Sequence, residues 1–304
     1  MVLAARAWSA VVVALVGCAQ APAPQPLTPR DVAATDAPVD AASPRDAAPD
    51  VPAVDAPAPT DAPTPDAQTP TDVPVAPSCG ASVSPLTSRV SQVVLVIVPT
   101  WGATHGDLLR YERTPGGRWT PVGARVAVAM GRAGLGWGRG LHGQGAPAGC
   151  EGPGKSEGDG RSPAGVFALG AVYGDHSDAG AFAYTVTTPT WRCPDDPASA
   201  HYNEVLDGAS VTPDWNSAET MVRADGLYRW VVFVEHNTAP RVPRGGSCIF
   251  LHVWAGASST TAGCTSMERG ALEEILAWMR PGEAVQVALP ASVYATVRGP
   301  WGLP

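Results

Sequence analysis

The sequence predicts a mainly β domain, of the α+β type, that begins near residue 79. After this position, short apolar segments rich in valine alternate with glycine and proline, which is the pattern of strands separated by turns. Only residues 267–280 show a strong helical repeat of apolar positions. Residues 19–78 contain no aromatic residue and consist mainly of Ala, Pro, Asp, Thr and Val, so they cannot build a hydrophobic core.

Residues 1–18 are expected to form a lipoprotein signal peptide. A lone basic residue, Arg6, precedes an apolar run at residues 10–16 that is too short to span a bilayer. The run ends in Leu-Val-Gly-Cys, which resembles the lipobox of bacterial lipoproteins and would make Cys18 the lipid-bearing residue. We therefore expect an exported protein, anchored in the bacterial envelope on the periplasmic side of the outer membrane. The alternative is a free cysteine near an ordinary cleavage site.

Residues 19–78 are predicted to be an extended, disordered linker. Recurring prolines favour a solvated polyproline-like chain that would act as a tether. The linker holds nine Asp and two Arg, so its net charge of −7 accounts for nearly all of the chain's −8. The folded part is close to neutral and has no basic run, so we expect no nucleic-acid partner.

The expected strands follow in order from residue 93. Residues 93–98 form a continuous apolar run typical of a buried strand, and residues 284–289 alternate in hydrophobicity as a final strand. The other strand candidates are residues 122–130, 165–173, 182–187, 230–235 and 247–254. The helix at 267–280 is stopped by Pro-Gly, and Thr265 with Glu268 fits a capping box at its start. A weaker helix is expected at residues 217–224.

Six cysteines in an exported chain predict disulfide pairing. With Cys18 assigned to lipid and Cys264 to chemistry, four cysteines remain, which fits two disulfides in any of three connectivities. The four are Cys79, Cys150, Cys193 and Cys248. No two cysteines are two to four residues apart, and no histidine pair shows ligand spacing, so we expect no metal.

Cys264 and His252 are the candidate catalytic pair. His252 ends an apolar strand, and Cys264 follows in a small-residue turn that the helix prediction places at a helix N-terminus, where thiolate is favoured. His252 would form an ion pair with the thiolate and later protonate the leaving amine. Gly263 and Cys264 would offer N–H groups to an oxyanion, and Thr261 would orient the imidazole. The alternative is a buried structural cysteine beside a core histidine.

The segment from Cys248 to Met267 resembles the active-site segment of the L,D-transpeptidase catalytic domain. The family motif is a histidine followed, after a dozen or more residues, by Ser/Thr-His-Gly-Cys, and the matching positions are His252, Thr261, Gly263 and Cys264. Supporting similarity lies at residues 131–138, 155–167, 195–204 and 215–221. The resemblance covers roughly residues 93–289 and implies a β-sandwich that carries the nucleophile and base, with a helix after the catalytic cysteine. Residues 79–304 are therefore expected to be an L,D-transpeptidase-like catalytic domain.

The resemblance implies a transferase that acts on peptidoglycan stem peptides without a cofactor. The thiol would attack the carbonyl between diaminopimelate and D-Ala, form a thioester and expel D-Ala. A second stem, a protein or an amino acid would then resolve the thioester in cell-wall cross-linking or remodelling, whereas water would give L,D-carboxypeptidase activity. A catalytically inactive wall-binding lipoprotein is the alternative of a different class. A papain-like peptidase fits less well, because the cysteine here follows the histidine.

Four residues are the candidates for substrate binding. Trp254 lies two residues beyond His252 on the same strand face, and His236 and Asn237 follow a predicted strand. Arg161 belongs to a charged loop that is able to bind stem-peptide carboxylates. The chain departs from the family motif in having Ala262 in place of the second histidine and Ser266 in place of Asn or Arg, which leaves the acyl acceptor open.

Overall fold

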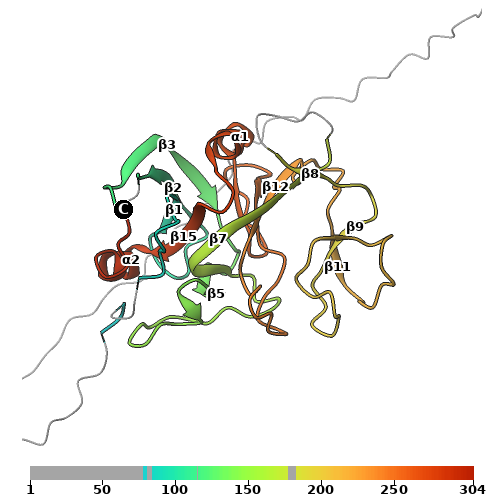
Figure 1. Ribbon diagram of the computed structural model, residues 1–304. Helices are drawn as coiled ribbons and strands as arrows, with labels where there is room; N and C mark the ends of the chain where they lie inside the picture. The colour runs from blue at the N-terminus through green and yellow to red at the C-terminus, as the bar shows by residue number, and fades with distance from the viewer. Residues whose placement is uncertain (1–77, 81–83, 115, 177–182) are drawn as a thin grey trace, which may run out of the picture. The chain divides into compact units, whose positions relative to one another are not determined.

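The main sheet contains ten strands and closes on itself, and several of these strands are labelled in Figure 1. The computed structural model describes residues 78–80, 84–114, 116–176 and 183–304. Neighbouring strands follow the order β12, β13, β14, β3, β2, β1, β15, β7, β4, and β8 pairs with β7. Because β12 pairs with β7 as well as with β13, the path returns to its start. The strands are β1 (Gln92–Val98), β2 (His105–Glu112), β3 (Thr120–Ala129), β4 (Leu135–Trp137), β7 (Ser162–Gly174), β8 (Thr185–Val186), β12 (Trp230–Val234), β13 (Phe250–Val253), β14 (Thr265–Met267) and β15 (Ala284–Pro290).

Strand β1 runs through the hydrophobic core. Val93, Val94 and Leu95 are at most 2% exposed, and the strand pairs in parallel with β15 and antiparallel with β2. Burial on both faces explains why its sequence is a continuous apolar run rather than an alternating one. The predicted mainly β fold class is confirmed, and β1, β3, β7, β12, β13 and β15 each overlap an expected strand.

A smaller sheet of three strands packs beside the main sheet. It has the order β10 (Leu206–Asp207), β9 (Trp191–Pro194) and β11 (Ala218–Thr220), and β5 (Arg139–Gly140) pairs separately with β6 (Gly143–Gln144). The weak helix expected at residues 217–224 is wrong, since β11 pairs antiparallel with β9. Tertiary pairing here overrides local preference, and the Cys193–Cys248 disulfide joins β9 to the segment before β13.

Two helices occur in the described residues, α1 (Arg269–Trp278) and α2 (Ala291–Val297). Helix α1 begins later than expected, because residues 265–267 form β14. The predicted capping box is wrong: Glu268 is itself the N-cap, and its carboxylate accepts the Ala271 N–H at 3.2 Å. The Thr265 hydroxyl instead accepts a hydrogen bond from the side-chain amide of Gln286.

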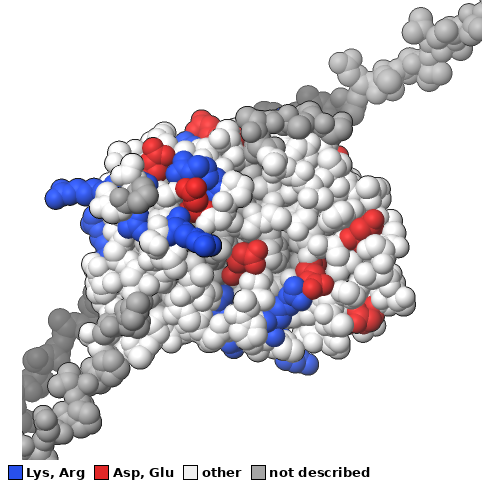
Figure 2. Space-filling model, in the orientation of Figure 1, with Lys and Arg blue, Asp and Glu red and all other residues white. Residues whose placement is uncertain are grey.

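The four expected disulfide cysteines form two bridges, Cys79–Cys150 and Cys193–Cys248, and Cys264 is free. Residues 1–77, which hold the expected signal peptide, Cys18 and nearly all of the linker, lie outside the described residues, as does the start of the strand expected at 182–187. In the part of the chain described, no helix is long and apolar enough to cross a membrane, and no cluster of side chains has the makings of a metal site. On the face in Figure 2, basic and acidic side chains lie near one another, and most of the surface carries neither.

Candidate active site

The candidate catalytic pair lies at neighbouring strands of the main sheet. His252 is the third residue of β13, and Cys264 comes directly before β14. The two strands are parallel and adjacent, with His252 paired to Ser266. Residues twelve positions apart in the sequence therefore meet at one end of this strand pair, where both line the same cavity.

The imidazole of His252 is held by the backbone of its own strand. Its Nδ1 lies 2.7 Å from the carbonyl oxygen of Val253, and because a carbonyl only accepts, Nδ1 carries the proton. Nε2 then has a free lone pair. The side chain is buried, and desolvation lowers the pKa of His252 to about 4, so the resting imidazole is neutral. The prediction that Thr261 orients the imidazole is wrong, since the Val253 carbonyl is its hydrogen-bond partner.

Thr261 instead stabilises the turn that delivers Cys264. Its hydroxyl donates to the Cys264 carbonyl at 2.7 Å and accepts the Gly263 N–H at 3.1 Å. Gly263 is tightly packed, because a Cβ there would lie 3.0 Å from the Arg161 carbonyl oxygen and 3.1 Å from the Cδ1 of Ile249. The Gly263 N–H is thus occupied, whereas that of Cys264 makes no hydrogen bond within the described part of the chain.

The Cys264 thiol is buried at 5% residue exposure. Its sulfur accepts the Phe250 N–H at 3.4 Å and lies 3.6 Å from the Cys248 carbonyl oxygen. Desolvation first, and then the negative charge of Glu219, raise the pKa of Cys264 to about 12. The expected thiolate at a helix N-terminus is wrong, because β14 and Glu268 separate Cys264 from α1, so the helix dipole acts too far away. The resting pair is a thiol and a neutral imidazole.

Two cavities meet at Cys264. The first has a volume of about 210 Å³ and also contacts His252, Trp254 and Tyr228. The second has a volume of about 130 Å³ and is lined by charged groups that include Lys155. Cys264, Ala262 and Glu219 line both. An alanine in place of the family's second histidine therefore lies where the two cavities join.

Of the four residues expected to bind substrate, Trp254 is the one that lines a cavity together with Cys264. His236 and Asn237 line neither cavity beside Cys264. The His236 Nε2 donates to Gly245, and the Asn237 side chain bonds Val242 and Gly246, so both hold the loop before β13. Burial lowers the pKa of His236 to about 3, in keeping with a neutral structural ring.

Arg161 also lies away from the two cavities. Its guanidinium donates to the carbonyl oxygens of Ala133 and Leu135 at 2.8 and 2.9 Å. These bonds tie the loop before β7 to the start of β4 and the loop that precedes it. The loop's contribution to the cavities comes from Lys155 and Glu157 instead.

Glu219 and Tyr228 also line the first cavity, and the sequence does not predict either as a site residue. The Tyr228 hydroxyl donates to Glu219 Oε2 at 2.5 Å, and the Tyr228 ring packs edge-on against the His252 ring with centroids 5.2 Å apart. Tyr228 lies in no motif, whereas Glu219 lies in residues 215–221, which resemble the family, and within the stretch that was expected to be helical. Only the pairing of β11 with β9 reveals its position.

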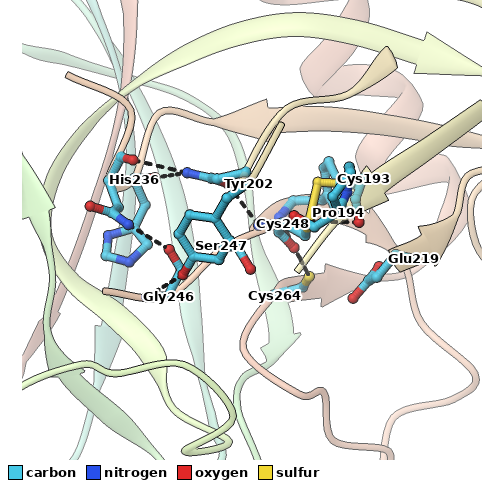
Figure 3. Close-up of a disulfide and its surroundings, with 12 residues drawn as sticks. Cys193, Pro194, Tyr202, Glu219, His236, Gly246, Ser247, Cys248 and Cys264 are labelled. Atoms are coloured by element: carbon cyan, nitrogen blue, oxygen red, sulfur yellow. Dashed lines mark hydrogen bonds between the residues drawn. A yellow bond between two sulfur atoms is a disulfide. The ribbon is translucent and has the colours of Figure 1, made fainter. Parts of the chain in front are cut away.

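The Cys193–Cys248 disulfide places Glu219 beside the nucleophile (Figure 3). Glu219 is directly opposite Cys193 in the β9–β11 pairing, and Cys193 is bonded to Cys248, whose carbonyl lies against the Cys264 sulfur. The figure shows the Glu219 carboxylate on the same side of the disulfide as Cys264. The bridge therefore fixes the smaller sheet as one wall of the site.

The fold and the site define a cysteine-based member of a known enzyme family. Residues 97–287 match the family model of the L,D-transpeptidase catalytic domain, YkuD, and this match covers more than half of the chain. The chain therefore belongs to this family, whose members are cysteine acyltransferases that act on peptidoglycan. No curated protein matches the sequence significantly.

Among solved structures, the chain is similar to one described as the structure of Bdellovibrio bacteriovorus Bd1075. The two share 12% sequence identity with a TM-score of 0.35, over 70% of this chain and 52% of the other. This chain thus spans about half the length of that one.

Proposed function

We propose that this protein is a peptidoglycan L,D-transpeptidase-like acyltransferase with Cys264 as nucleophile and His252 as base. The observation that carries the proposal is the pairing of a free thiol with an imidazole whose Nε2 lone pair is available, on one cavity. The other four cysteines of the described domain are in disulfides, so Cys264 is its one thiol. The donor substrate is a stem peptide with a bond between diaminopimelate and D-Ala.

The acylation step passes one proton from the Cys264 thiol through His252 to the leaving amine. As the substrate carbonyl approaches, His252 Nε2 takes the thiol proton and the sulfur attacks the carbonyl carbon. The developing oxyanion is stabilised by the Cys264 N–H, the turn donor that makes no hydrogen bond to any described residue. His252 then protonates the leaving amine, D-Ala departs, and a thioester remains on Cys264. Because both groups begin neutral, charge separates only with substrate in place.

Envelope anchoring completes the proposal. The lipobox-like sequence before Cys18 and the Ala/Pro/Asp-rich linker are the features that support it. A long tether would let the domain search the cell wall from a membrane. In Cys18→Ser we expect the protein to leave the membrane fraction, and unchanged fractionation would refute the anchor.

The enzymatic test follows D-Ala. Incubating the protein with a disaccharide tetrapeptide that contains diaminopimelate should release D-Ala with wild type and not with Cys264→Ala. Cys264→Ser is the near-isosteric control, which keeps the fold and removes the thiol. His252→Gln should lower the rate at least about a hundredfold, the usual contribution of a general base. Absence of both D-Ala release and a covalent Cys264 adduct with a carbapenem would rule out the proposed reaction.

A further inference from the structure

We propose that Glu219 is a catalytic residue of the second half-reaction: it binds the ammonium group of the acyl acceptor and removes its first proton. This inference rests on the proposed function and concerns what resolves the thioester on Cys264. It assigns the second cavity to an acceptor amine that arrives in its protonated form.

Glu219 has one committed oxygen and one free oxygen. Oε2 accepts the Tyr228 hydroxyl at 2.5 Å, whereas Oε1 accepts no hydrogen bond from the residues that the structure describes. Tyr228 is in turn fixed by edge-on ring contacts with His252 and Phe250 and by the Arg223 guanidinium over its ring. A carboxylate held through one oxygen keeps the other in a constant position beside the nucleophile.

A second polar group of the same cavity is unsatisfied. Asp195 lines the second cavity, and its Oδ1 is buried without a hydrogen-bond partner among the described residues. Buried acceptors of this kind cost stability unless a ligand or another group satisfies them. An ammonium group has three donors and can bond Glu219 and Asp195 together. In the neighbouring cavity the buried Ser266 hydroxyl also has no hydrogen-bond partner among the described residues, so a ligand bound on that side of Cys264 would have a polar group to satisfy.

The cationic side chains around the second cavity do not bond the Glu219 and Asp195 carboxylates in the way proposed for the ammonium group. Lys155 bonds the Asp159 carboxylate at 2.6 Å and the Ser156 carbonyl at 2.8 Å, and Arg223 pairs with Asp225. Arg132 is exposed at the lining of the second cavity. Glu157 accepts from Tyr202 and Ser247, so it is satisfied.

The surroundings also make Glu219 a better proton acceptor than an ordinary carboxylate. Burial raises its pKa, as do the charges of Asp195 and Glu157, whereas the Tyr228 hydrogen bond and Arg223 act in the opposite direction. On balance the pKa of Glu219 is raised, so it lies closer to the pKa of an ammonium group than the pKa of an ordinary carboxylate does.

The proton count explains why a second base is needed. An ammonium must lose one proton before its nitrogen has a lone pair, and it loses another as the amide bond forms. In the proposed reaction Glu219 takes the first proton and the neutral amine attacks the thioester carbonyl. His252 Nε2 then takes the second proton. The carbon–sulfur bond breaks, the departing thiolate receives the proton held by His252, and Glu219 returns its proton to solvent. The products are a new amide and the Cys264 thiol.

The test compares two acceptors in Glu219→Gln, using the full-length protein and the tetrapeptide donor at pH 7. D-methionine presents an ammonium group, whereas hydroxylamine is already unprotonated at this pH. We expect the variant to lose D-methionine transfer about a hundredfold relative to thioester hydrolysis, the usual effect of removing a general base. Transfer to hydroxylamine relative to thioester hydrolysis should stay within about twofold of wild type, whatever the rate of acylation, and raising the pH to 9.5 should restore D-methionine transfer. Asp207→Asn, a partly exposed carboxylate of the same small sheet that lines neither cavity, is the charge control.

Four results would overturn the assignment. Equal D-methionine transfer by variant and wild type would mean that Glu219 takes no proton. Parallel loss with both acceptors would mean a structural role, and so would failure of Glu219→Asp to restore any transfer. Wild type that only hydrolyses its thioester would exclude an amine acceptor, whereas wild type that releases no D-Ala would refute the proposed function itself.

Discussion

The protonation state of Cys264 in the resting protein predicts how the reactivity of its thiol depends on pH. The pKa of Cys264 is about 12 against an ordinary value of 9.0, and the pKa of His252 is about 4. Three pKa units correspond to a preference of about 4 kcal/mol for the neutral thiol. At neutral pH the thiolate fraction is then about a thousandfold smaller than that of an ordinary thiol.

The assay is alkylation of Cys264 by iodoacetamide, read by the mass of the peptide that contains it. Burial slows the absolute rate, so the slope with pH is the informative quantity. We expect the rate to rise about tenfold per pH unit from pH 7 to pH 10, because the pKa lies above this range. Glu219→Gln should react faster at each pH, since the charge of Glu219 is one cause of the raised pKa. A rate that is independent of pH between 6 and 9 would show a thiolate–imidazolium pair and refute the reasoning.

Three further predictions concern the fold and the cavity. Replacing both Cys193 and Cys248 with serine should lower the free energy of unfolding by up to about 4 kcal/mol, since the bridge closes a long loop, and should also lower D-Ala release; unchanged urea midpoints would contradict this. Stability should fall as pH drops from 6.5 toward 4, by up to about 1.4 kcal/mol per unit for each of His236 and His252, because protonation then favours the unfolded chain; a flat urea midpoint over this range would refute it. Ser266→Ala should leave stability unchanged or raise it by about 1 kcal/mol, because the hydroxyl is unsatisfied, yet raise the KM for the donor; an unchanged KM would exclude a substrate contact.

Much of the sheet can be predicted from the sequence because its strands carry local signals. The valine run of β1 is apolar on both faces, since the strand is buried on both faces. Strand β2 was missed, because Asp107, Arg110 and Glu112 interrupt its apolar pattern. Arg110 is buried and paired with Glu274, a contact between segments far apart in the chain. Such long-range compensation leaves no local signature.

The start of α1 was misplaced for a related reason. Thr265 and Glu268 have the spacing of a capping box, but pairing of residues 265–267 with β13 and β3 takes precedence over extending the helix. This difference also changes the expected protonation state of Cys264, because a thiolate was expected only if the helix began directly after it. The turn of Thr261 and Gly263 was located correctly by residue type, whereas its hydrogen bonds needed the structure.

Some residues of the candidate site could be predicted from the sequence and others could not. Cys264, His252 and Trp254 were placed at one site by short-range spacing and strand alternation, and they line one cavity. Glu219 reaches that cavity through the pairing of β11 with β9, and the Tyr228 hydroxyl bonds it there; sequence spacing reports neither contact. The four disulfide cysteines left three connectivities open, and three-dimensional proximity selects one.

The most direct test of the account is the mass of the protein after reaction with a carbapenem. The account predicts one covalent adduct, located on Cys264, that is absent in Cys264→Ser and much slower to form in His252→Gln. An adduct on another residue, or none at all while the protein remains folded, would contradict the assignment of Cys264 as the nucleophile.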